Sequence, residues 1–179
     1  MIYKTIFNKK EVKDISNFIL DNEERIKKLG PSMYNNGDSL TGRFYIYNFF
    51  NSDIGHLLKK KILPFLEENN INKPASIQCW ANVFRKGENI PRHIHGDEDG
   101  LKFHVANIFF KGDEKIGTTY ILNKDEKVIE NRSGEIVLFN SHIPHYVRKN
   151  NSSRPRISMA LDIHQNVLLK DLKRFYHWI

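Results

Sequence analysis

The sequence predicts a mainly β fold with flanking helices, a jelly-roll core buttressed by its N-terminal segment. Two observations carry this prediction. Apolar residues recur at helical spacing in the first part of the chain, and from Ala75 their period changes to two. Short strand-like runs then follow at intervals of about 8–12 residues, which is typical of antiparallel sandwiches and barrels. We expect one domain in the 179 residues, with a helical buttress at 1–74, a β core at 75–164 and a C-terminal helix at 165–179.

Two helices are expected in the buttress. Asn8 and Glu11 have the spacing of a capping box, and Gly30-Pro31 ends the helix that they open. The apolar face of this first helix comprises Val12, Ile15, Ile19, Ile26 and Leu29. A second helix should begin near Ser52 or Asp53, and Pro64 should kink it or end its regular part. Its buried stripe comprises Ile54, Leu57, Leu58, Ile62 and Phe65.

The rest of the chain alternates between strands and turns. A final helix is expected from about Val167 to Trp178. The strands are expected at residues 77–84, 103–110, 117–122, 127–130, 135–139, 145–148 and 155–163.

Composition narrows the class of protein. Hydrophobic residues make up 40% of the chain, which indicates a globular protein. The single cysteine, Cys79, lies in an apolar run and fits a small buried residue in a reduced, cytoplasmic protein, and no stretch is apolar enough for a signal peptide or a membrane span. The net charge of +7 favours acidic partners. It permits nucleic acid without indicating it, because the only tight basic run, Lys59-Lys60-Lys61, fits a solvated helix surface.

Three histidines are the candidate metal ligands. His93 and His95 are two residues apart, so in a strand both imidazoles point to the same side. His145 follows a tight corner at the end of a predicted strand, where it could meet the first two. Three imidazoles suit iron, zinc, copper or nickel and leave coordination positions open. The alternative is that the His-x-His pair faces solvent in a polar loop.

Arg156 and Ser158 form a candidate anion site. They share one face of a predicted strand, with Ile157 on the other. An inward arginine in a barrel is costly unless a carboxylate or phosphate neutralises it, and the serine hydroxyl can add a hydrogen bond. The alternative is an arginine that lies at the surface beside a serine.

Residues 77–163 resemble the double-stranded β-helix core of the 2-oxoglutarate- and iron(II)-dependent dioxygenases, and especially the small oxygenases of bacteria and phages. The resemblance rests on four segments, which are Trp80-Ala-Asn82, His93-Ile-His-Gly96, Phe139 to His145, and Arg156-Ile-Ser158. It implies that His93 and His145 bind iron(II) and that Arg156 and Ser158 hold the far carboxylate of 2-oxoglutarate. It also implies inward polar groups near the cosubstrate at Asn82 and Tyr120.

One position departs from the family pattern. Most of these enzymes have His-x-Asp or His-x-Glu where this chain has His93-x-His95, so a three-histidine site would leave the iron with more net positive charge. His95-Gly96-Asp97 is itself a His-x-Asp, so Asp97 could replace one of the two histidines. We favour His93 with His95, because His-x-His-Gly matches the phage-type relatives and Asp97 opens an acidic loop.

The function that the resemblance implies is a hydroxylase that couples oxidative decarboxylation of 2-oxoglutarate to oxidation of a C–H bond. Its partners would be dioxygen and an organic substrate whose identity the sequence does not indicate, and neither does it indicate an oligomeric state. A cupin-type metalloenzyme would use the same three histidines without 2-oxoglutarate. A metal-free β-barrel binding module is the third hypothesis.

Overall fold

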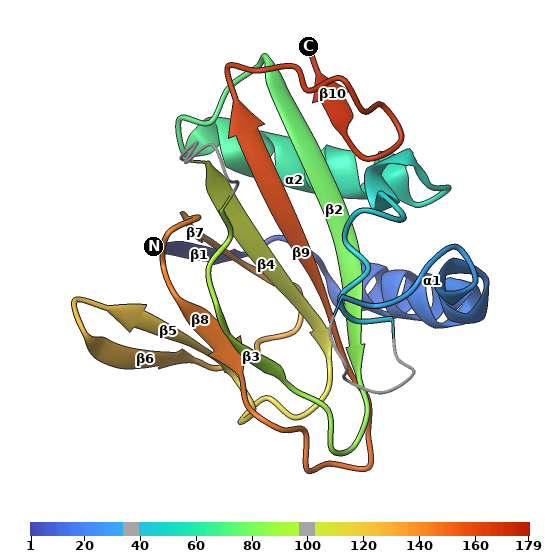
Figure 1. The fold of residues 1–179 in the computed structure, drawn as a ribbon, viewed down its shortest axis with the longest axis vertical. Coiled ribbons are helices and arrows are strands. Elements are labelled where there is room, and N and C mark those ends of the chain that lie inside the picture. The colour runs from blue at the N-terminus through green and yellow to red at the C-terminus, as the bar shows by residue number, and fades with distance from the viewer. Residues whose placement is uncertain (34–39, 97–102) are drawn as a thin grey trace.

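The computed structural model describes residues 1–33, 40–96 and 103–179 and shows two sheets with helices packed on one of them (Figure 1). The helices are α1 (Lys9–Lys27), a 3-10 turn (Phe49–Asn51) and α2 (Gly55–Glu68). The strands are β1 (Ile2–Thr5), β2 (Ala75–Phe84), β3 (Ile90–His93), β4 (His104–Lys111), β5 (Thr118–Leu122), β6 (Asp125–Ile129), β7 (Glu135–Asn140), β8 (His145–Val147), β9 (Arg156–Gln165) and β10 (Tyr176–Trp178).

Both sheets are antiparallel throughout. The larger sheet has the order β1-β7-β4-β9-β2-β10, and the smaller sheet has the order β3-β8-β5-β6. The non-consecutive neighbours show that the chain crosses repeatedly between the sheets, as in a jelly-roll. The mainly β fold with flanking helices that the sequence predicts is therefore confirmed.

The centre of the larger sheet is the long pair β2 and β9, which is buried on both faces. One face packs against α1 and α2 and forms the main hydrophobic core. Strand β9 contributes Ile157, Met159, Leu161 and Ile163 to this core, all without solvent exposure. The alternate residues of β9, from Arg156 to His164, face the other way and line a pocket. A single strand thus joins the core to the pocket.

The helices follow the sequence pattern closely. Asn8 and Glu11 form a capping box, as predicted, with each side chain accepting a hydrogen bond from the backbone N–H of the other. Helix α1 ends at Lys27, so Leu29 lies beyond it and is 56% exposed rather than part of the apolar face. Helix α2 begins at Gly55 and continues past Pro64 to Glu68, so the helix does not end at the proline.

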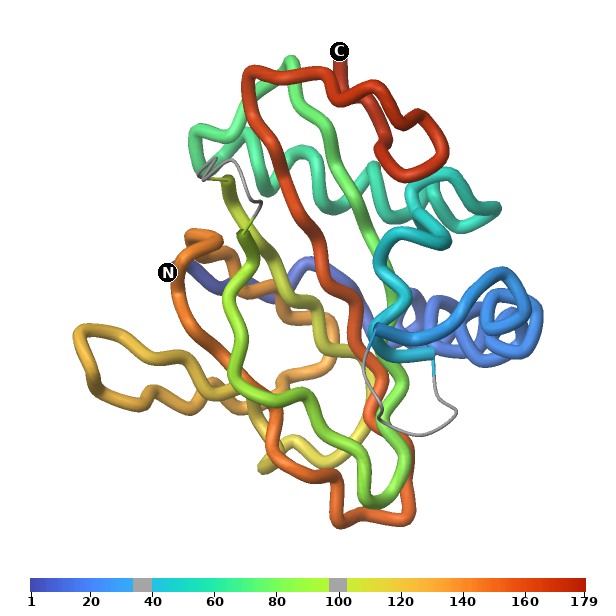
Figure 2. Tube along the Cα trace, in the orientation of Figure 1, coloured from blue at the N-terminus to red at the C-terminus, as the bar shows by residue number. Residues whose placement is uncertain are grey.

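The predicted C-terminal helix is wrong. Residues 166–175 form turns, and the chain then adds β10 to the edge of β2, where Figure 2 shows the trace folding back. The Asp171 carboxylate accepts hydrogen bonds from the backbone N–H groups of Lys173 and Arg174, and the Ser76 hydroxyl bonds to the backbone of Val167 and Leu169. These side chains satisfy backbone groups that a helix would otherwise pair.

The buttress also contains a strand that the periodicity does not show. Strand β1 pairs with β7 at the edge of the larger sheet, and all four of its residues are exposed. None of the described helices is long and apolar enough to cross a membrane. Cys79 is buried in the core beside Met159, as its apolar surroundings in the sequence predict.

Candidate functional site

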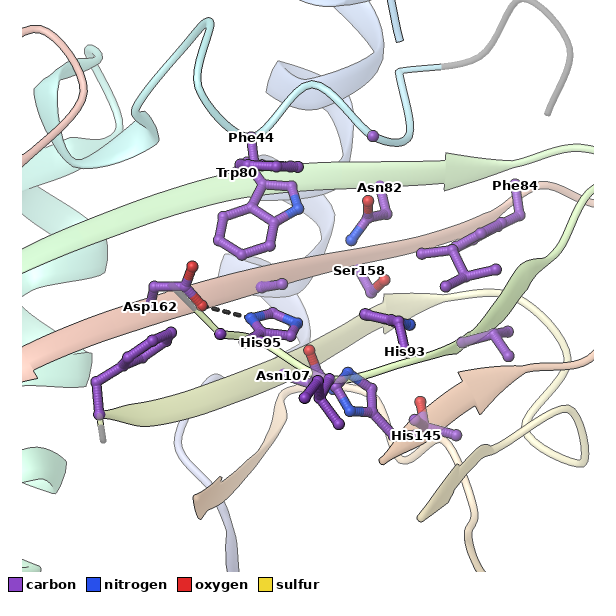
Figure 3. Close-up of a pocket in the computed structure, with 18 of the residues that line it drawn as sticks. Phe44, Trp80, Asn82, Phe84, His93, His95, Asn107, His145, Ser158 and Asp162 are labelled. Atoms are coloured by element: carbon purple, nitrogen blue, oxygen red, sulfur yellow. Dashed lines mark hydrogen bonds and ion pairs between the residues drawn. The ribbon is translucent and has the colours of Figure 1, made fainter. Parts of the chain in front are cut away.

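The candidate site is a pocket between the two sheets (Figure 3). Its floor is the face of β2 and β9 that points away from the helices. Cross-strand pairs there bring Phe84 opposite Arg156 and Asn82 opposite Ser158. Its roof is the end of the smaller sheet, which brings His93 and His145 over the floor.

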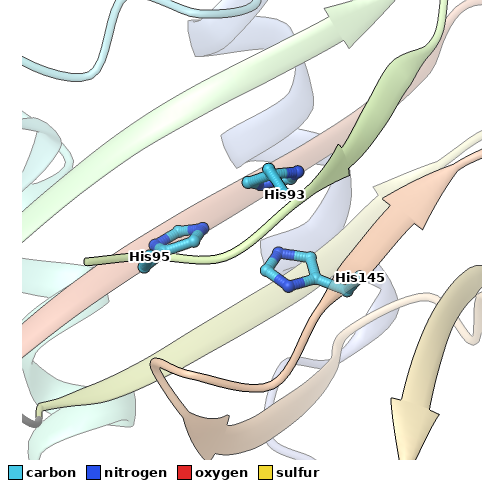
Figure 4. Close-up of side chains that lie close together, drawn as sticks. All are labelled: His93, His95 and His145. Atoms are coloured by element: carbon cyan, nitrogen blue, oxygen red, sulfur yellow. The ribbon is translucent and has the colours of Figure 1, made fainter. Parts of the chain in front are cut away.

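Three histidines meet at the roof of this pocket (Figure 4). His93 on β3 and His145 on β8 are direct register partners, with ring centroids 4.3 Å apart. His95 follows two residues after His93, just beyond the end of β3. One ring nitrogen from each residue lies within 4.8 Å of the other two. The structure therefore brings together the three predicted metal ligands.

The hydrogen bonds of the three rings suit a metal. In each ring Nδ1 lies next to an oxygen acceptor. The acceptor is the Pro91 carbonyl for His93 (2.9 Å), the Ile143 carbonyl for His145 (3.0 Å), and Asp162 Oδ1 for His95 (2.5 Å). A carbonyl cannot donate, so Nδ1 carries the proton in a neutral ring and Nε2 keeps its lone pair. The residues present therefore offer a three-nitrogen donor set that fits a first-row transition metal.

Burial keeps two of these rings uncharged. Desolvation, helped by the neighbouring His93 and His95, lowers the pKa of His145 to about 3. Desolvation also lowers the pKa of His93. Both rings are thus neutral at physiological pH, which is the protonation state that a metal requires.

Arg156 lies at one end of the floor, buried among neutral partners. Its terminal nitrogens donate to Ser158 Oγ (2.9 Å), Thr118 Oγ1 (3.2 Å) and Asn131 Oδ1 (3.2 Å). The rings of Phe84 and Phe109 lie against the guanidinium, and no carboxylate among the described residues pairs with it. Burial lowers the pKa of Arg156 to about 10, so the group stays charged at neutral pH. A buried cation without a counter-charge indicates a site for an anion.

The two remaining predicted residues differ in their placement. Asn82 lies on the pocket floor next to Ser158, and its buried Oδ1 has no hydrogen-bond partner among the described residues. Tyr120 is fully buried behind the roof, where its ring stacks on His145 and its hydroxyl accepts from Asn107. It does not line the main pocket but a smaller cavity that shares Arg156 and Ser158 with it. Burial raises the pKa of Tyr120 to about 12.

The structure also adds residues that the sequence patterns do not single out. Asp162 binds His95, and Asn107 and Arg174 line the pocket. The alternation of side chains along β9 could have identified Asp162, because Asp162 lies on the same face of the strand as Arg156 and Ser158. The alternative ligand Asp97 lies outside the described residues.

The sequence matches one family model, described as "Putative 2OG-Fe(II) oxygenase", over residues 99–162. This match contains His145, Arg156 and Ser158 and begins after His93 and His95. Among curated proteins, none matches the sequence significantly.

Solved structures share the fold at low sequence identity. A prolyl-4-hydroxylase from Pseudomonas putida has a TM-score of 0.70 at 16% identity, with 93% of this chain and 92% of that chain covered. HygX from Streptomyces hygroscopicus, solved with nickel and 2-oxoglutarate bound, has a TM-score of 0.64 at 12% identity, covering 92% and 81%. SnoN, an alpha-ketoglutarate-dependent epimerase from nogalamycin biosynthesis, has a TM-score of 0.66 at 12% identity, covering 92% and 77%. The predicted family resemblance is therefore confirmed in sequence over residues 99–162, and the solved structures confirm the fold.

Proposed function

We propose that this chain, which resembles the 2-oxoglutarate- and iron(II)-dependent oxygenases, is itself such an oxygenase and hydroxylates a C–H bond of an organic substrate. In this proposal His93, His95 and His145 hold the iron through Nε2, and Arg156 with Ser158 binds the far carboxylate of 2-oxoglutarate. The observation that carries the proposal is the buried, uncompensated charge of Arg156 in the same pocket as the three histidines.

Each part of the pocket then has a definite task. Arg156, Ser158 and Thr118 bind the cosubstrate carboxylate and replace its hydration with fixed donors, which strengthens the interaction in a pocket of low dielectric. Asn82 offers a further polar group beside Ser158. The sheets surround the reacting atoms and limit access of water. When bound, the iron and 2-oxoglutarate supply the oxidising power, so no side chain needs to act as a general acid or base.

Hydroxylation is the finer part of this proposal. The similar structures include a prolyl-4-hydroxylase and an epimerase, so this fold supports more than one outcome of the oxidation. We favour hydroxylation because it needs no chemistry beyond what the iron and 2-oxoglutarate supply.

A titration of the anaerobic, iron(II)-loaded protein with 2-oxoglutarate tests the function. We expect a visible metal-to-ligand charge-transfer band in the wild type. Arg156→Ala should need at least about tenfold more 2-oxoglutarate, because the charge-assisted hydrogen bonds are lost. Arg154→Ala is the matched control, since Arg154 is exposed two residues away and should titrate like the wild type.

The three-histidine ligand set favours a second candidate, a cupin-type metalloenzyme without 2-oxoglutarate. Iron that binds without producing the band, with equal behaviour of Arg156→Ala and wild type, would support this candidate and contradict the proposed function.

A further inference from the structure

The pocket extends beyond the metal site, away from Arg156. Along the floor, the cross-strand pairs continue from Ser158 through Ala160 to Asp162 and His164. Arg156 and Asp162 are six positions apart in β9, about 20 Å at roughly 3.3 Å per residue. Because Asp162 contacts His95, the histidines divide the pocket into an Arg156 end and an opposite end. A cosubstrate held by Arg156 and the metal leaves the opposite end for the substrate.

A second arginine lies at this opposite end. Arg174 lines the pocket, and its Nε donates to Gln78 Oε1 at 3.1 Å. Gln78 is the register partner of Asp162, and its own side-chain amide donates to the Phe44 carbonyl. Arg174 therefore lies beside the floor at the level of His95 and its partner.

Arg174 is held in place both at its backbone and at its guanidinium. Its backbone N–H donates to the Asp171 carboxylate, and its backbone carbonyl accepts from Asn48. The rings of Phe175 and Phe44 lie 5.0 and 6.0 Å from its central carbon. A side chain fixed in this way loses little entropy when it binds a ligand.

The Arg174 guanidinium forms no ion pair within the described residues, because the Asp171 carboxylate bonds to the backbone N–H of Arg174. No carboxylate there pairs with it, and its two terminal nitrogens have no hydrogen-bond partner there. Asp162, an acidic group on the floor of the pocket, is already bonded to His95. Two parallel N–H groups of a guanidinium match a carboxylate or a phosphate.

We propose that the substrate of this oxygenase carries a carboxylate or phosphate group that Arg174 binds, with an apolar or aromatic body against Phe44 and Trp80. The two rings lie 5.6 Å apart, and Trp80 stacks on His95, so they form an apolar wall between Arg174 and the metal ligands. The anion fixes one end of the substrate and thereby places a C–H bond near the metal. This inference rests on the proposed function, because it assigns the Arg156 end to 2-oxoglutarate.

Calorimetric titration of nickel-loaded protein saturated with 2-oxoglutarate tests the inference. The probes are phenylacetate, phenyl phosphate and phenylacetamide, of which the first and last have nearly the same shape and differ in charge. We expect at least one anion to bind the wild type about tenfold more tightly than the amide, as a charge-assisted hydrogen bond predicts. The stronger of the two anions then identifies the group as carboxylate or phosphate.

Variants of Arg174 test whether this residue causes the preference for the anions over the amide. Arg174→Gln should remove the difference between anion and amide and leave 2-oxoglutarate affinity unchanged, whereas Arg174→Lys should keep part of it. Arg154→Gln, the same change at an exposed site, should bind like the wild type. Melting curves check that each variant is folded, and the backbone contacts of residue 174 do not depend on its side chain.

Three results would overturn the inference: equal affinity of the wild type for anion and amide, a preference that survives in Arg174→Gln, or displacement of 2-oxoglutarate by the anions. A different result contradicts the proposed function, namely that the nickel-loaded protein does not bind 2-oxoglutarate. An anion preference that depends on Arg174 would then still establish this site.

Discussion

His95 and Asp162 form a hydrogen-bonded pair whose side chains are only 9% and 11% exposed. The carboxylate orients the ring so that Nε2 points toward the other two histidines. In the proposed metal site it would also place a negative charge beside one ligand, whereas three neutral imidazoles carry none. A carboxylate in this position raises the basicity of a ligand histidine. If His95 binds the metal as proposed, Asp162 would supply through it the charge that a ligand carboxylate supplies in His-x-Asp sites.

Replacing Asp162 by Asn removes the negative charge but keeps the hydrogen bond, because the amide oxygen can still accept from Nδ1 of His95. We expect Asp162→Asn to bind cobalt(II) about 10–100-fold more weakly than the wild type, measured by competition with a chelator. In a His95→Asp background the same change should cost nothing or even raise affinity, because Asp162 would then lie beside a like charge. An equal loss in both backgrounds would show that Asp162 has only a structural role.

Most of the candidate site could be predicted from single residues in their strands. His93, His145, Arg156, Ser158 and Asn82 are brought together because parity in a strand fixes the side on which each lies. Tyr120 shares that parity, since it is the register partner of His145, but it packs behind the roof. An inward side chain reaches the cavity only if it is not buried too far between the two sheets. The alternation of residues in a strand does not show how far between the sheets a residue lies.

The connection between β4 and β5 touches the Arg156 end of the pocket directly. Gly112 has φ of +137°, and a Cβ there would lie 2.9 Å from the Arg156 Cα and 3.1 Å from its Cβ. The register of β4 with β9 shifts at the same place, between Phe109 and Lys111. This close approach links the shape of the turn to the position of the guanidinium.

Gly112→Ala should therefore weaken 2-oxoglutarate binding as well as stability. Gly87→Ala is the matched control, because Gly87 also has positive φ (+93°) but its Cβ would meet only the Lys149 side chain, at 4.0 Å. Both variants should lose at least about 1–2 kcal/mol of unfolding free energy from backbone strain. Only Gly112→Ala should need several-fold more 2-oxoglutarate in the anaerobic titration. A similar shift in both variants would mean that general strain causes the loss.

The elements that the sequence predicts well are those with one polar and one apolar face, such as α1, and those buried on both faces, such as β2 and β9. The two edge strands of the larger sheet are not predicted. Strand β1 has no buried face and thus no alternation, and β10 has only three residues after a turn held by Asp171. Edge pairing depends on partners far away in the chain, here β7 and β2, so local periodicity cannot reveal it.

At the scale of the whole molecule, we expect the buried histidine cluster to lower the stability of the metal-free protein in acid. An unfolded histidine has a pKa near 6.5, and the pKa of His145 in the folded chain is about 3. Between these two values the unfolded chain binds a proton that the folded chain does not. The free energy of unfolding should thus fall as the pH drops below about 6.5, by up to about 1.4 kcal/mol per pH unit from this group.

Urea unfolding with a chelator present, at about pH 7.5 and about pH 5, measures this dependence. His145→Gln should lose less stability between the two values than the wild type does, because it lacks the titrating ring. His142→Gln, at an exposed position three residues earlier, should keep the wild-type dependence. An unchanged dependence in His145→Gln would contradict the assignment of the acid sensitivity to this ring.

The alternation along β9 also bears on how such a protein can diverge. Ile157, Met159, Leu161 and Ile163 maintain the core, while their neighbours in sequence line the pocket. Substitutions that alter substrate choice can therefore occur at Ala160 or His164 while the alternate residues of β9 keep the core packed. A mutant library restricted to these two pocket positions would explore new specificities in proteins that still fold.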